Sequence, residues 1–262
     1  MSGSGSRGVL PLSVVRRGWL LAAPALALLM ISAACDGGSP ASVGNITPLC
    51  RPIARVDRFR YTLKYTLDSP QPTGEVDESA VGEPPFALTP NGPDFRFEQE
   101  MNGEVENPDR IRLVSKTPET AELQIITVGD EQWTLLGGQW MSGGQQASPF
   151  PPVATCDAIL KGLDLNGAEP SADTIDGQEV LRYELKGIEL ETAVTIFAEK
   201  SDMGRLLKAY DLTLWLSKKD RSPVRIESVS VGTYPSGRQL TMNISLSFKD
   251  INAGDINVDP PV

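Results

Sequence analysis

Histidine is absent from this chain of 262 residues. Because histidine is the usual general base near neutral pH and a frequent metal ligand, its absence excludes Ser-His-Asp and Cys-His triads and every zinc site that contains histidine. Walker motifs and dinucleotide fingerprints are also missing. We therefore expect no metal, no cofactor and no catalytic residues, and a protein that is not an enzyme. A hydrolase that uses a pair of carboxylates is the alternative that the sequence leaves open.

Basic residues are fewer than acidic residues. The chain has 24 Lys and Arg against 34 Asp and Glu, which gives a formal net charge of -10. This sign opposes attraction to a phosphate backbone, so we expect no nucleic acid partner. With 40% hydrophobic residues and 22% charged residues, the composition is that of a globular protein with a sizeable core.

Long hydrophobic runs are missing except near the N-terminus. Residues 18–31 (GWLLAAPALALLMI) are apolar, three arginines precede them, and no acidic residue occurs before position 36. Such a run fits a signal-peptide core of roughly 7–15 residues better than a spanning helix of about 20. We predict a signal peptide over residues 1–34 and an exported protein.

Cysteine is scarce, with three residues in the chain. Residues 31–35 (ISAAC) resemble a bacterial lipobox, although Ser32 stands where leucine is usual. The resemblance implies a lipid on Cys35 and a protein anchored to the outer face of the cell membrane. Residues 36–45 (DGGSPASVGN) are small and polar, so we expect residues 35–47 to form the lipid anchor and a flexible tether. The alternative is a buried or disulfide-bonded Cys35 behind an ordinary signal cut.

An odd number of cysteines in an exported protein requires a free thiol, an intermolecular pair or a modification. If Cys35 carries lipid, Cys50 and Cys156 remain to form a disulfide in an oxidising compartment. Two buried free thiols are the alternative.

Alternation of apolar and polar residues dominates the rest of the chain. It is clearest over residues 59–67 and 240–248, which predict two long strands with one buried face. Shorter strands are expected over residues 95–101, 111–115, 122–128, 132–136, 180–186, 210–217 and 224–231. Short turns between them indicate an antiparallel meander. The phase of the apolar residues slips near Ser228, which suggests a bulge there.

Helical spacing occurs over residues 153–163 and 192–208. Nine strands and two helices predict an α+β fold: a strongly curved antiparallel sheet, or incomplete β-barrel, closed on one side by two short helices and enclosing an apolar cavity. Residues 48–262 are expected to form one domain. The proline-rich segment Ser69 to Pro93 is either a solvated loop or a lid.

Several short patterns occur in a characteristic order: GEV followed by NPDRIR at residues 103–112, IITVGDEQW and GQW at 125–140, LTLWLSKKD and SPVRI at 212–226, and SFKDIN and NVDPP at 247–261. In this order they resemble the cell-envelope lipoproteins of the LppX/LprG type, relatives of the LolA and LolB lipoprotein carriers. The resemblance implies a half-barrel around a cavity for lipid acyl chains. The long helix with which members usually begin is missing, since Pro48 and Pro52 leave room for one or two turns.

The predicted function is to bind or ferry a lipid or other apolar ligand in the cell envelope, without catalysis. An interaction, sensor or scaffold protein with a filled barrel is the alternative, and its envelope partner is not identified by the sequence. Trp133 and Trp140 are also candidates for the cavity rim. For each residue expected to face the cavity, ordinary core packing is the alternative role; they are Tyr61, Leu63, Tyr65, Phe97, Met101, Leu113, Ile125, Trp133, Ile196, Phe197, Leu214, Ile226, Met242, Ile244 and Leu246.

Overall fold

The computed structural model of the protein describes residues 47–70, 94–117, 122–143, 151–160, 163–189, 207–233 and 238–261. The predicted signal peptide, Cys35 and nearly all of the tether therefore lie outside the described residues. So does most of the segment Ser69 to Pro93.

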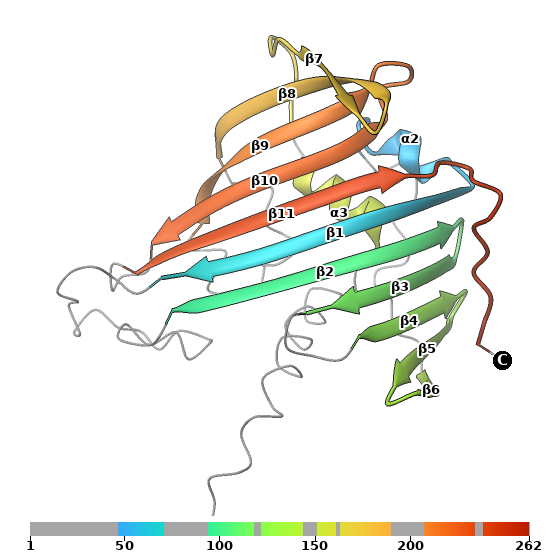
Figure 1. The fold of residues 1–262 in the computed structure, drawn as a ribbon. Helices are drawn as coiled ribbons and strands as arrows, with labels where there is room; N and C mark the ends of the chain where they lie inside the picture. Colours follow the sequence, from blue (N-terminus) through green and yellow to red (C-terminus); the bar gives the residue numbers. More distant parts are fainter. Residues whose placement is uncertain are drawn as a thin grey trace, which may run out of the picture.

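One open, curved antiparallel sheet of eleven strands organises the described chain (Figure 1). Its spatial order is β6-β5-β4-β3-β2-β1-β11-β10-β9-β8-β7, so the first and last long strands meet at the centre. The strands are β1 (Arg58–Ser69), β2 (Phe95–Glu106), β3 (Arg110–Lys116), β4 (Leu123–Val128), β5 (Glu131–Leu136), β6 (Gln139–Gly143), β7 (Ser171–Ile175), β8 (Gln178–Glu189), β9 (Leu207–Ser217), β10 (Pro223–Thr233) and β11 (Gln239–Lys249).

The sequence prediction of a curved antiparallel sheet is confirmed, and all nine expected strands are present. Strands β6 and β7, the two edges, were not predicted. Each has five residues, and neither shows a clear alternation of apolar and polar side chains. Short edge strands pack on few neighbours and so carry a weak sequence signal.

Two short helices lie on the same side of the sheet, behind β9–β11 in Figure 1: α2 (Arg51–Ala54) and α3 (Pro152–Leu160). Helix α3 ends three residues before the predicted limit at Leu163. The second predicted helix, residues 192–208, falls mostly outside the described residues, and its last two residues begin β9. No helix in the described ranges has the length and apolar character needed to cross a membrane.

The bulge expected near Ser228 is not present. β10 pairs regularly with β11 from Arg225 to Thr233. Its register against β9 shifts between 223 and 225 and again between 230 and 232, and it is regular from 225 to 230, around Ser228. The strand therefore keeps its phase. As a result Ser228 and Ser230 are buried, whereas Val229 and Val231 are exposed.

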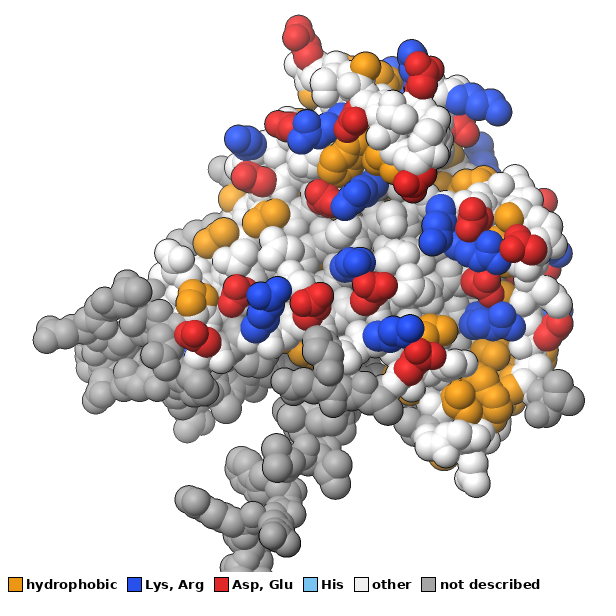
Figure 2. Space-filling model, in the orientation of Figure 1, with side chains coloured by type: hydrophobic (Ala, Val, Ile, Leu, Met, Phe, Trp, Pro, Cys, Tyr) orange, Lys and Arg blue, Asp and Glu red, His pale blue; other side chains and the backbone are white. Residues whose placement is uncertain are grey.

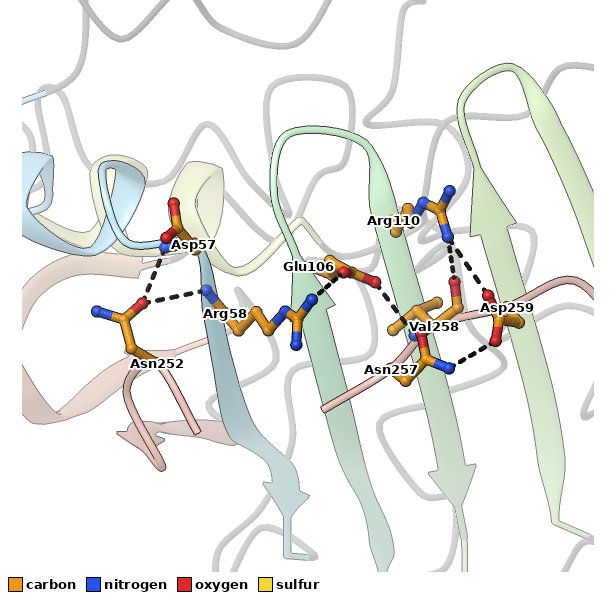
Figure 3. A network of polar contacts seen from close by, with 8 residues as sticks. All are labelled: Asp57, Arg58, Glu106, Arg110, Asn252, Asn257, Val258 and Asp259. Atoms are coloured by element: carbon orange, nitrogen blue, oxygen red, sulfur yellow. Dashed lines mark hydrogen bonds and ion pairs between the residues drawn. The ribbon is translucent and has the colours of Figure 1, made fainter. Parts of the chain in front are cut away.

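The C-terminal tail after β11 runs along the ends of the neighbouring strands (Figure 3). The side-chain oxygen of Asn252 accepts hydrogen bonds from the backbone N–H of Asp57 at 3.0 Å and of Arg58 at 3.4 Å. Farther along, the Val258 N–H donates to Glu106, and Arg110 donates to the Val258 carbonyl at 3.2 Å. These contacts attach the tail to the first strands of the sheet.

Two apolar side chains of this tail, Ile256 and Val258, are completely buried. We expect Ile256→Ala to lower the free energy of unfolding by about 3 kcal/mol, because it removes buried methyl groups and leaves a cavity. Ile251→Ala is the matched control: Ile251 is 43% exposed in the same segment, so its change should stay within about 0.5 kcal/mol. Urea denaturation of both variants measures the difference, and equal stabilities would contradict this role of the tail.

Candidate functional site

The concave side of the sheet, called the inner face here, is formed by rows of paired residues that cross the strands. One row runs through Tyr183, Leu214, Ile226, Leu246, Leu63, Met101, Ser115 and Leu123. The next row contains Phe248, Tyr61, Gly103, Leu113, Ile125, Thr134 and Met141. Directly opposed residues share a face, so the register alone assigns these side chains to one side.

The inner face is uncharged. In β1–β6 and β9–β11 the described side chains that point to this side include no Asp, Glu, Lys or Arg. Most of them belong to one buried apolar cluster, which also contains Ile53 of α2 and Ile159 and Leu160 of α3. The helices therefore pack on the same side as these rows. Such a surface suits apolar contacts. A buried cation adjoins it at one end: Arg238, which precedes β11, donates to the hydroxyl and the carbonyl oxygen of Ser69 at the end of β1.

Twelve of the residues expected to face the cavity lie on the inner face, namely Tyr61, Leu63, Tyr65, Phe97, Met101, Leu113, Ile125, Leu214, Ile226, Met242, Ile244 and Leu246. All are buried except Phe97, which is half-buried and packs beside Tyr65 with 6.1 Å between ring centroids. Ile196 and Phe197 lie outside the described residues.

The inward placement of Trp133 is wrong. Trp133 pairs with Ile126, which pairs with Arg112, so it lies on the convex side, called the outer face here. Its neighbours Gln132 and Thr134 point inward instead. In β5 the apolar side chain of Trp133 thus lies on the outer face, the opposite of the arrangement in the central strands. Pairing with the neighbouring strand fixes the face of every residue in a strand, whatever the hydrophobicity of that residue.

Gly103 is placed directly beneath the ring of Tyr61. An added Cβ at this glycine would lie 2.0 Å from Cε1 of Tyr61, far inside van der Waals contact. Tyr61 is itself buried, and burial raises the pKa of its hydroxyl well above the usual value. The absence of a side chain at position 103 lets the tyrosine ring lie flat against β2.

We expect Gly103→Ala to lower the free energy of unfolding by about 2 kcal/mol, because the new methyl group must displace a buried ring. A loss of stability would indicate the clash with the buried ring, because replacing glycine by alanine in a strand interior is otherwise stabilising. Gly254→Ala is the control, because no atom lies within 4 Å of its Cβ position. Near-UV circular dichroism should change for Gly103→Ala only, and a Gly103→Ala protein as stable as the parent would contradict this packing.

The outer face has the opposite character. Ion pairs cross its central strands, for example Arg60–Glu104 at 2.9 Å, Arg112–Glu104 at 3.0 Å and Lys64–Glu100 at 2.8 Å. In Figure 2 the basic and acidic side chains alternate on this side of the molecule. The pKa of Glu100 is lowered, chiefly by Lys64. The charges thus face water, as in a sheet with one solvated face.

Trp215 forms a small apolar cluster on the outer face with Val180 and Val224. The guanidinium groups of Arg182 and Arg225 lie 5.7 and 5.5 Å from its ring centroid. Its indole N–H donates to Asp173 of β7 at 3.0 Å and lowers the pKa of that carboxyl. These contacts attach the edge strand β7, so this tryptophan has a structural role.

Polar residues on the inner face were missed by the sequence analysis. Gln99 and Ser115 are buried there, and the amide of Gln99 donates to the Ser115 hydroxyl at 2.8 Å. Gln132 is buried on the same face and pairs with Thr127. Gln99 lies in phase with Phe97 and Met101 on β2, and this phase was the signal that could have identified it. No group of three or more Cys, Asp or Glu residues in the described ranges could hold a metal ion.

Comparison with solved structures found likenesses in fold. LppX of Mycobacterium tuberculosis has 15% sequence identity and a TM-score of 0.42, over 90% of this chain and 99% of LppX. LprF of Mycobacterium bovis has 13% identity and a TM-score of 0.47, over 86% and 98% of the two chains. A putative outer membrane lipoprotein-sorting protein domain of Vibrio parahaemolyticus has 10% identity and a TM-score of 0.23, over 76% and 89%.

This chain resembles LppX-type lipoproteins in fold. The resemblance stated from the sequence patterns is therefore confirmed at the level of fold. No protein-family model and no curated protein matches the sequence. The TM-scores of these three structures all lie below 0.5.

Proposed function

We propose that this protein is an exported, membrane-anchored lipoprotein that holds or carries an apolar molecule, of the class of lipids, on the inner face of its sheet. The observation that carries the proposal is the uncharged inner face, which runs across the sheet opposite an ion-paired outer face. Ligand sites for apolar molecules are concave, mostly apolar and supplied with a few polar groups. Binding of this kind needs no catalyst.

The size of the described helices supports the proposal. Strand β1 has 12 residues and extends roughly 40 Å. Helix α3 has 9 residues and extends roughly 13 Å. The two described helices are therefore small relative to the nine strands whose described inward side chains are uncharged. Phe97 is only half-buried on this face, and an apolar ligand would bury it further.

Native mass spectrometry of the gently purified protein tests the ligand. We expect an additional mass that is released on denaturation, and one apolar molecule taken up per protein after the ligand has been removed. A protein that neither carries nor takes up an apolar molecule would contradict the proposal. It would favour the alternative, an envelope scaffold or sensor whose interior is filled by its own side chains.

The anchor is tested separately by intact-mass analysis of the mature protein. We expect a chain that begins at Cys35 and carries a diacylglyceryl group, and loss from the membrane fraction in Cys35→Ser. The mature net charge is about -13 once residues 1–34 and their three arginines are removed, so a basic patch would not replace the lipid. A mature chain without lipid would refute the anchor and leave the ligand proposal standing.

A further inference from the structure

Polar side chains interrupt the apolar inner face at several places, Ser228 and Ser230 of β10 among them, and two polar sites on β2–β5 each contain a buried glutamine. The first polar site is Gln99 with Ser115, on β2 and β3. The second polar site is Gln132 with Thr127, on β5 and β4. Gln99 and Gln132 are each 7% exposed. Glutamine is mostly found at protein surfaces, so two buried on one apolar face require an explanation.

The hydrogen bonding of these sites is incomplete. The Oε1 atoms of Gln99 and Gln132 and the Oγ1 atom of Thr127 are buried and have no hydrogen-bond partner in the protein. The amide nitrogen of Gln99 is already bonded to Ser115. Leaving a buried polar atom unpaired costs about 1–3 kcal/mol, so a partner that enters the inner face would relieve this cost at both sites.

The two sites are separated along the strands. Thr127 pairs with Ile111, which precedes Ser115 by four residues on β3, so the offset between the sites is roughly 13 Å. The apolar pair Leu113 and Ile125 lies between them in the register. A molecule that contacted both sites would therefore meet a polar group, then hydrocarbon, then a second polar group.

The chemistry of the partner follows from the groups present. A hydroxyl can donate to a glutamine oxygen or accept from a glutamine nitrogen, so it suits both amides. A carboxylate or phosphate would require a cation, and the described inner-face side chains of β2–β5 include no Lys or Arg. The buried Arg238 already donates to Ser69 at the end of β1. Resting on the proposed function, we propose that the ligand is a neutral lipid with hydroxyl groups, which Gln99 and Gln132 recognise.

Three lipids with the same acyl chain test this selectivity: 1-oleoylglycerol, which is neutral and has two hydroxyls, methyl oleate, which has none, and oleate, which is anionic. Their dissociation constants for the full mature protein are measured after removal of bound lipid. We expect 1-oleoylglycerol to bind about tenfold more tightly than either of the others, the worth of one or two neutral hydrogen bonds.

The double variant Gln99→Met with Gln132→Met should remove this preference, because methionine has a similar length and cannot satisfy a hydroxyl. Gln124→Met makes the same change on β4, where the residue is half-buried on the outer face and donates to Glu122, and it should keep the preference. A preference that survives in the double variant would overturn the inference, since the two amides would then be satisfied by water or structure alone.

The wild-type series remains decisive if the double variant does not fold. Equal affinities of the wild-type protein for all three lipids would overturn the inference and leave the proposed function intact. Binding of none of the three would overturn both.

Discussion

Removal of the disulfide between Cys50 and Cys156 is expected to lower the free energy of unfolding by about 5 kcal/mol. The bond joins residues 106 apart in sequence, and a cross-link that closes a loop of this size removes about that much chain entropy from the unfolded state. Natural domains are stable by about 5–15 kcal/mol. Loss of the bond would therefore remove between about a third and all of a stability in this range.

The local structure adds to this effect. Cys50 precedes α2 and Cys156 lies within α3, and both are completely buried in the main apolar cluster. Near them the Thr47 N–H donates to Asp157 at 2.6 Å. The disulfide is thus the covalent link between the two described helices on the inner face.

Denaturation of Cys50→Ala, Cys156→Ala and the double variant measures the contribution. Each single variant already lacks the cross-link, so we expect the double variant to be hardly less stable than either one. Losses that add between the two single variants would show that the cysteines stabilise the protein by packing alone. A loss below about 1 kcal/mol would contradict the entropic account.

Introduction of a charge on the inner face is expected to have the largest effect on binding. Phe97→Lys should reduce the affinity for an apolar molecule roughly a hundredfold, because an ammonium group placed against hydrocarbon loses its hydration. Phe97 is half-buried, so the lysine side chain can extend toward water and the fold is preserved. The affinity is measured by titration with a fluorescent acyl ester.

Glu98→Lys is the matched control for this variant. It adds a lysine to the neighbouring position of β2, but Glu98 lies on the outer face, where its side chain is 48% exposed and pairs with Arg96. We expect its affinity to equal that of the wild type. Equal losses of affinity in the two variants would indicate a general effect of net charge and would contradict binding at the inner face.

Much of this architecture could be predicted from the sequence because the central strands alternate strictly. In β1 as far as Leu67, and throughout β11, every second residue is apolar, and the burial found in the structure follows this alternation. The pairing of Cys50 with Cys156 was one of two alternatives left by cysteine number, and it is confirmed. Where one face of a strand is buried and the other is solvated, the alternation of apolar and polar residues is sufficient to predict the strand and its buried face.

The errors share one physical origin. In β5 and β10 the apolar residues Trp133, Val229 and Val231 point outward, while Gln132 and Ser230 point inward. Their faces are determined by pairing with neighbouring strands, and single-strand periodicity contains no information about that register. Gln132 was missed for the same reason, whereas Gln99 lies in phase with Phe97 and Met101 and could have been identified from its own strand.

The central claim is that the inner face of the sheet holds an apolar molecule. Photo-crosslinking with an acyl chain that carries a diazirine, followed by peptide mapping, tests this most directly. The account predicts labels on inner-face residues of β1–β4, such as Met101, Leu113 and Ile125, and competition by unlabelled lipid. Labels confined to outer-face residues such as Trp133 and Trp140 would contradict it.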